Sequence, residues 1–137
     1  TNGQSWNPSW DLTSGVETWF GVVVKNEKVV ELNLAFNNLQ GVLPEALGDL
    51  VYLEKINFFR NNLTGNIPNS IGNLTELKIL NLAFNKLNGT LPSSIGNLTS
   101  LVTLEVFMNN LEGEIPSTIG QLNSLEKIQH QKFNKQK

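Results

Sequence analysis

The sequence repeats with a period of 24 residues, and this period restricts the fold more than any other feature. The repeating block reads V-x-x-L-x-L-x-x-N-x-L-x-G-x-L-P-x-x-L-G-x-L-x-x, and four copies in one register cover residues 29–124. A period in the twenties is typical of a solenoid, in which each coil buries its apolar face only against its neighbours. Function is then expected on an extended surface rather than in a pocket. The copies begin at Val29, Leu53, Leu77 and Leu101.

The composition is that of an ordinary soluble chain and excludes several classes of function. The 137 residues suffice for one domain, and 39% apolar with 16% charged residues is typical of a globular protein. A net charge of −2 without a cluster of Lys or Arg argues against a nucleic-acid partner. No apolar run approaches about 18 residues, so we expect no membrane insertion in this segment. The absence of cysteine excludes disulfides, thiol nucleophiles and zinc–thiolate sites.

Each copy contains a short segment in which apolar and polar residues alternate, as in Ile56-Asn57-Phe58. Alternation with period two predicts a short strand with one buried face, and stacked coils then build a parallel sheet. An asparagine follows every such segment. We expect it to be buried, because its amide can satisfy backbone groups freed at the turn, and loss of one should cost about 1–3 kcal/mol. The residues of this predicted structural ladder are Asn37, Asn61, Asn85 and Asn109.

A turn follows the asparagine in every copy. Gly41 and its equivalents allow close approach between coils or a positive φ, and a Leu-Pro or Ile-Pro pair then fixes the turn. The segment P-x-x-[LI]-G-x-L predicts a short helical or 3₁₀ turn. A second set of glycines is expected to help end that turn. This second set is Gly48, Gly72, Gly96 and Gly120.

The full pattern resembles the plant-type leucine-rich repeat. The match, L-x-x-L-x-L-x-x-N-x-L-x-G-x-[IL]-P-x-x-[IL]-G-x-L, covers residues 29–124 without an insertion. The resemblance implies an α/β repeat solenoid: a right-handed horseshoe segment with a concave parallel sheet, a second layer of short strands, and short helical or 3₁₀ turns on the convex side. Members of the family are protein or peptide recognition modules, which include receptor ectodomains and inhibitors of secreted polysaccharide-cleaving enzymes.

Residues 1–28 precede the repeats and are expected to cap the first coil. They contain Trp6, Trp10 and Trp19, and an apolar run followed by a polar turn before Val29 predicts a hairpin. A solenoid end must be covered, so we favour capping over ligand stacking for the tryptophans. The W-x-G-V-x-V pattern resembles the amino-terminal cap of the family. A cap without cysteines is similar to those of bacterial secreted and surface members.

Residues 125–137 are interpreted as a degenerate or truncated fifth repeat with a polar tail. Leu125 and Ile128 continue the pattern, but His130 replaces an apolar strand residue and Phe133 stands at the asparagine position. A lone histidine in a decaying coil fits a tolerated replacement better than a ligand or a catalyst. Without cysteine, a histidine cluster or a close carboxylate pair in the pattern, we expect no catalytic site, no metal and no cofactor.

The exposed positions of the predicted strands are the remaining candidates for function. Neighbouring strands lie about 4.8 Å apart, so each position becomes a column of side chains across the sheet. Phenylalanines and a methionine form a zigzag stripe on a face that meets water, and such stripes mark interaction sites. Alternatively, some rings, Phe36 and Phe84 in particular, pack sideways against neighbouring coils. The candidate partner-binding residues on the concave face are Phe36, Phe59, Arg60, Phe84, Phe107, Met108, Asn33, Asn57, Asn81 and Glu105.

These columns predict a module that binds a protein or peptide outside the cytoplasm or at the cell surface. The amide column of Asn33, Asn57 and Asn81 suits hydrogen bonds to a peptide backbone or a glycan, although a solvated sheet face also explains it. The expected partner is a protein or peptide, with or without an attached glycan. Two alternatives stay open: an inhibitor of a secreted glycan-degrading enzyme, and a structural or adhesive array segment with weak self-association.

Overall fold

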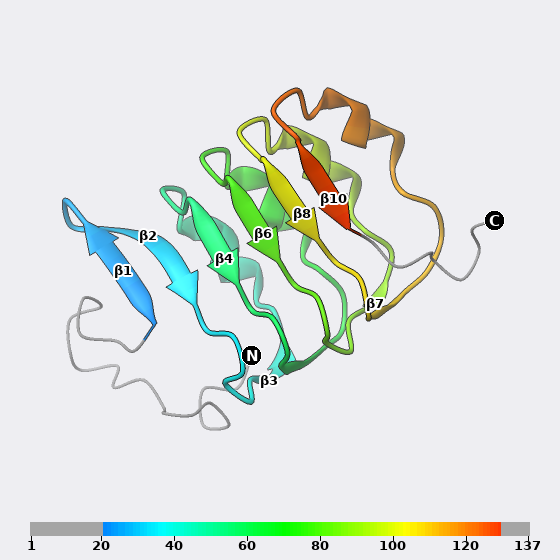
Figure 1. Ribbon diagram of the computed structural model, residues 1–137, viewed down its shortest axis with the longest axis horizontal. Helices are drawn as coiled ribbons and strands as arrows, with labels where there is room; N and C mark the ends of the chain where they lie inside the picture. Colours follow the sequence, from blue (N-terminus) through cyan, green and yellow to red (C-terminus); the bar gives the residue numbers. More distant parts are fainter. Residues whose placement is uncertain (1–20, 130–137) are drawn as a thin grey trace.

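The computed structural model describes residues 21–129, and its main element is a six-stranded sheet in the order β1-β2-β4-β6-β8-β10 (Figure 1). From β2 onward each pair of strands is parallel, and residues 24 apart in the sequence lie opposite each other, as Asn57 and Asn81 do. Each repeat is therefore one coil, and the predicted solenoid is confirmed. The strands are β1 Val22–Lys25, β2 Lys28–Asn33, β4 Lys55–Asn57, β6 Ile79–Asn81, β8 Thr103–Glu105 and β10 Lys127–Gln129.

The rest of each coil carries shorter elements: in Figure 1 the short helices lie behind the sheet, and the short strands β3 and β7 lie below the ends of its strands. Two pairs of very short parallel strands form a second layer, β3 with β5 and β7 with β9. Every helical segment of the described residues is a 3₁₀ helix of five residues. The short strands are β3 Gln40–Val42, β5 Asn62–Thr64, β7 Asn88–Gly89 and β9 Asn110–Leu111, and the helices are η3 Glu45–Asp49, η4 Asn69–Asn73, η5 Ser93–Asn97 and η6 Ser117–Gln121.

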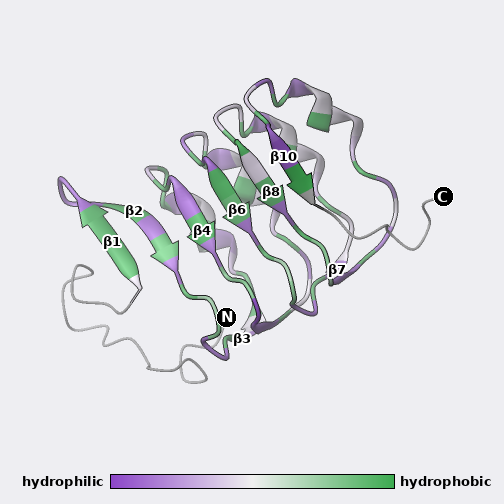
Figure 2. Ribbon diagram, viewed as in Figure 1, coloured by the Kyte–Doolittle hydropathy of each residue, from purple (hydrophilic) through white to green (hydrophobic). Residues whose placement is uncertain are grey.

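Leucine and isoleucine side chains between the two sides form one continuous core. Leu53, Leu77 and Leu101, which open successive repeats, are fully buried, as are the strand residues Leu80 and Leu104. Figure 2 shows hydrophobic residues recurring at equivalent places from coil to coil. Burial of one such side chain stabilises the folded chain by about 1.5–3 kcal/mol. Because each coil covers the next, this burial is what drives the coils to stack.

An antiparallel hairpin precedes the first parallel pair. Strand β1 pairs with β2, and the linking residues Asn26 and Glu27 have φ angles of 51° and 67°. Positive φ at both central residues is characteristic of the type I′ turn, whose twist suits a two-residue hairpin. β1 thereby covers one edge of β2. The tryptophans predicted to cap the coil and the altered residues of the fifth repeat lie outside the described residues; they are Trp6, Trp10, Trp19, His130 and Phe133.

The glycines of the 3₁₀ helices permit close contact between coils. They lie inside the helices rather than after them, contrary to the role expected from the sequence. A Cβ atom on Gly72 would lie 2.7 Å from both the Cβ atom and the backbone oxygen of Ser94 in the next coil. The Ser94 hydroxyl also donates to the backbone oxygen of Asn69 at 2.7 Å, and Ser70 and Thr118 make the equivalent bonds. Gly48, Gly72 and Gly96 thus each let a hydroxyl side chain of the next coil pack against them.

We expect Gly72→Ala to destabilise the protein by about 1–3 kcal/mol, because the added methyl group overpacks the contact with Ser94. Gly120→Ala is the matched control, since no described atom lies within 4 Å of an added Cβ there. Its free energy of unfolding should change by less than about 0.5 kcal/mol. Urea unfolding of the two variants measures both values. Equal losses at the two positions would contradict the packing argument.

Buried asparagines join each coil to the one before it. The Asn61 side-chain nitrogen donates to the backbone oxygen of Phe58 in its own coil, at 2.9 Å, and of Leu34 in the preceding coil, at 3.0 Å. Its side-chain oxygen accepts from two backbone N–H groups of the preceding coil, both at 2.9 Å. Asn85 bonds across the coils in a similar way, and so does Asn109, which is half-buried rather than buried as expected from the sequence. One amide therefore fixes the turn of two coils at once.

Asn85→Ala should lower the free energy of unfolding by about 2–3 kcal/mol, because it leaves the N–H of Leu63 and the carbonyl of Phe58 buried without this partner. Asn97→Ala is the control, since Asn97 is exposed at the end of η5 and its replacement should cost less than about 0.5 kcal/mol. Urea unfolding again provides the readout. If both substitutions lower the free energy of unfolding equally, the asparagine ladder does not stabilise the fold.

Candidate binding surface

The amide column lies at the carboxyl ends of the sheet strands, where its members form hydrogen bonds. Asn33, Asn57, Asn81 and Glu105 end β2, β4, β6 and β8 and lie opposite one another in register. The Asn57 side-chain nitrogen donates to the Asn33 side-chain oxygen at 3.1 Å. The Asn57 and Asn81 oxygens each accept the backbone N–H of the residue two positions on, at 3.2 and 3.0 Å. Those two side chains therefore have fixed orientations.

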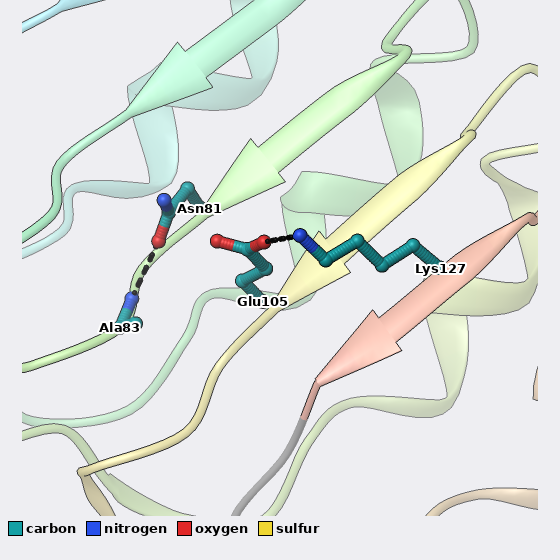
Figure 3. Close-up of polar contacts among 4 residues, drawn as sticks. All are labelled: Asn81, Ala83, Glu105 and Lys127. Atoms are coloured by element: carbon teal, nitrogen blue, oxygen red, sulfur yellow. Dashed lines mark hydrogen bonds and ion pairs between the residues drawn. The ribbon is translucent and has the colours of Figure 1, made fainter.

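Glu105 replaces the amide in the fourth coil and pairs with a lysine of the fifth. Its Oε2 atom lies 2.9 Å from the Nζ atom of Lys127 in β10, and its side chain is only 14% exposed. Figure 3 shows the carboxylate between Asn81 and Lys127. Lys127 was not among the residues expected from the sequence. It belongs to the neighbouring column of the sheet, so only its diagonal position relative to Glu105 could have indicated the pair.

Four phenylalanine rings form a continuous row beside the amide column. The rings of Phe36, Phe59, Phe84 and Phe107 meet edge to face, with centroids 5.6, 5.3 and 5.4 Å apart and planes inclined by 72–78°. Phe36 is 70% exposed, while the other three are half-buried. The rings of this row therefore pack sideways against one another and still remain partly exposed to solvent. Phe36, one of the two rings suspected of packing sideways, is the most exposed of the four.

The backbone at the end of each strand determines where these rings lie. Phe36, Arg60, Phe84 and Met108 all have φ between 57° and 60°, and each directly precedes an asparagine of the ladder. This left-handed conformation costs about 1–2 kcal/mol for a residue with a side chain. Inter-coil bonds such as that from the Arg60 N–H to the Ala83 oxygen, at 3.0 Å, hold it in place. Neither glycine nor asparagine occupies the position, so the sequence carries no local signal for it.

Arg60 places a positive charge in the row. The Cζ atom of its guanidinium lies 4.3 Å from the centroid of the Phe84 ring and 5.7 Å from that of Phe59, in cation–π contact. The side chain is exposed. Of the ion pairs formed by residues 21–129, one joins Glu54 to Lys78 and the other joins Glu105 to Lys127, so neither involves Arg60. The row thus combines apolar rings with an accessible guanidinium, and Met108, which is 46% exposed, lies at its far end.

This surface combines apolar rings, amides and charged groups on an extended face. No group of three or more potential metal ligands occurs within residues 21–129. In that same range no helix has the length and apolar character needed to cross a membrane. An open cavity of about 520 Å³ exists elsewhere, beside the second strand layer, where it is lined by Val42, Ile67 and Pro92 among others. The candidate residues therefore lie on an extended face, as a solenoid leads one to expect.

Comparison with known families agrees with this architecture. The family profile described as a leucine-rich repeat region matches residues 25–137. The chain belongs to the leucine-rich-repeat family. No match was found among curated protein sequences.

Solved leucine-rich-repeat structures share the fold of this chain. The structure of PEPR1–AtPEP1 is 28% identical over 86% of this chain and 17% of its own, with a TM-score of 0.82. The BIR3–SERK2 complex from Arabidopsis thaliana matches at 30% identity over 90% of this chain and 70% of its own, with a TM-score of 0.81. The plant peptide hormone receptor RGFR1 in complex with RGF2 matches at 37% identity over 79% and 20%, with a TM-score of 0.73. This leucine-rich-repeat chain thus spans only 17% of the length of the PEPR1 structure's chain and 20% of that of RGFR1.

Proposed function

We propose that this leucine-rich-repeat module binds an extended peptide, or an extended segment of a protein, on the concave face of its sheet, and that it does so outside the cytoplasm. The observation that carries the proposal is the row of Phe36, Phe59, Phe84 and Phe107 with the guanidinium of Arg60 above it. Aromatic residues and Arg supply most of the strong anchors in protein interfaces. An apolar row on an exposed face beside hydrogen-bonding groups matches the anatomy of such an interface.

The packing of the rings favours a peptide over a glycan. Sugars stack on the open faces of aromatic rings, whereas here each ring meets its neighbour edge to face, so that the inner rings are half-buried. Apolar and aromatic side chains of a peptide can pack against ring edges as well as ring faces. The exposed guanidinium of Arg60 further favours a partner with an acidic residue next to apolar ones, because charge-assisted hydrogen bonds to a carboxylate are strong.

The solved relatives support this proposal. RGFR1 is described as a peptide hormone receptor in complex with RGF2, and HAESA is likewise solved with a peptide hormone. Both are plant receptors whose chains extend well beyond the region matched here. Their ligands are properties of those proteins, and for this chain a peptide ligand is a proposal. The same comparison supports an extracellular location for this chain, which is likewise a proposal.

Substitution of Phe36 provides the test. Peptides selected from a displayed random library against the immobilised protein serve as probes, with affinity measured by fluorescence anisotropy. Phe36→Ser should weaken binding at least about tenfold, as expected for an aromatic anchor, while the unfolding temperature stays nearly unchanged because the ring is 70% exposed. Phe84→Ser should weaken binding and also lower stability, because this ring contacts both Phe59 and Phe107.

The matched control is Val51→Ser, which removes an exposed apolar residue from the turn after η3, outside the concave face. It should bind the peptides as the unmodified protein does. Light scattering on the same samples tests self-association, the competing use of an exposed ring. Wild-type affinity in Phe36→Ser would exclude the row as the peptide site.

A further inference from the structure

Two neighbouring side chains on the concave face present complementary hydrogen-bonding groups. Asn81 and Glu105 are register partners on β6 and β8, and parallel strands lie about 4.8 Å apart. The Asn81 oxygen accepts the backbone N–H of Ala83 at 3.0 Å. With its oxygen bound in this way, the remaining polar atom of the Asn81 side chain is its amide nitrogen, which is a donor.

Glu105 presents a hydrogen-bond acceptor instead of a donor. Its Oε2 atom is bound to Lys127 at 2.9 Å, and Figure 3 shows the other carboxylate oxygen, Oε1, on the side of Asn81. A carboxylate oxygen is purely an acceptor. The ion pair with Lys127 and the 14% exposure of the side chain hold this acceptor in one place. A fixed donor and a fixed acceptor thus stand next to each other on adjacent strands.

The equivalent groups one coil earlier are already used within the protein. The Asn57 oxygen accepts the N–H of Phe59, and the Asn57 nitrogen donates to Asn33. A bound chain would have to break the bond between Asn57 and Asn33 to use both ends of the Asn57 amide. A chain that binds to both Asn81 and Glu105 would not have to break a hydrogen bond between these two side chains. This distinguishes them from Asn33 and Asn57.

We propose that Asn81 and Glu105 together bind the main chain of one residue of the peptide. Asn81 Nδ2 donates to the carbonyl of that residue, and Glu105 Oε1 accepts its N–H. In an extended chain the N–H and C=O groups of one residue point to the same side, as they do when a residue in a strand exchanges both bonds with a partner. This inference rests on the proposed function and specifies it further: the rings of Phe84 and Phe107 contact side chains, while the polar pair reads the backbone.

N-methylation of the bound peptide tests the assignment. One library-selected peptide is resynthesised as a set in which each main-chain nitrogen in turn carries a methyl group. We expect one member to bind the unmodified protein about tenfold more weakly or worse, as loss of a charge-assisted hydrogen bond requires. In Glu105→Ala the penalty for that same methyl group should shrink to less than about threefold, because the acceptor is gone.

Three further variants separate a binding role from a structural one. Lys127→Ala breaks the ion pair but keeps the carboxylate, so the methyl penalty should persist there. Glu112→Ala removes an exposed acid just after β9, outside the concave sheet, and should behave as the unmodified protein does. Asn81→Asp keeps an acceptor for the Ala83 N–H but removes the donor, and should weaken every peptide of the set by about tenfold.

Circular dichroism and thermal unfolding confirm that each variant is folded before binding is measured. The inference is overturned if no methyl position is coupled to Glu105 while Phe36→Ser still abolishes binding. If Phe36→Ser has no effect, the proposed function itself fails, so the two failures are distinguishable.

Discussion

The hydrogen bonds of the buried asparagines are the constraint on which the rest of this structure depends. Each amide ties the turn of its own coil to the coil before it, as Asn61 does through Phe58 and Leu34. The apolar core supplies more free energy, but burial alone is non-directional and would tolerate slippage between coils. The hydrogen bonds of the amides are directional, so they hold each coil in one position relative to the coil before it. They explain why residues 24 apart remain in register in the pairs β2–β4, β4–β6 and β6–β8.

The asparagine ladder also determines where the residues of the candidate binding surface lie. Because the asparagine points inward in the turn that follows the strand, the residue before it adopts the left-handed region and its side chain stays on the outer side. Phe36, Arg60 and Phe84 occupy that position in successive coils. The other rings, Phe59 and Phe107, come from the position before it, and the alternation brings each ring against the edge of the next. Structure and candidate interface therefore share one cause, which is the fixed turn at the end of each strand.

Much of this could be predicted from the sequence, because the period is strict. Four aligned copies identify the inward leucines, the strand segments and the glycine–proline turns without knowledge of any contact. Aspects that depend on neighbouring coils were harder to predict. The exposure of Phe36 relative to Phe59 depends on what the neighbouring coils place around each ring. The role of Gly72 depends on Ser94 in the next coil. The pair of Glu105 and Lys127 crosses between columns, and a reading of single columns does not reveal it.

The central claim is that the concave face, and not the side with the 3₁₀ helices, receives the peptide. Backbone amide chemical shifts of the labelled protein, recorded during titration with a library-selected peptide, test this most directly. The account predicts that the largest shifts occur in the strands and the following turns, at residues 33–36, 57–60, 81–84 and 105–108. Largest shifts in η3 to η6, with an unaffected concave sheet, would contradict it.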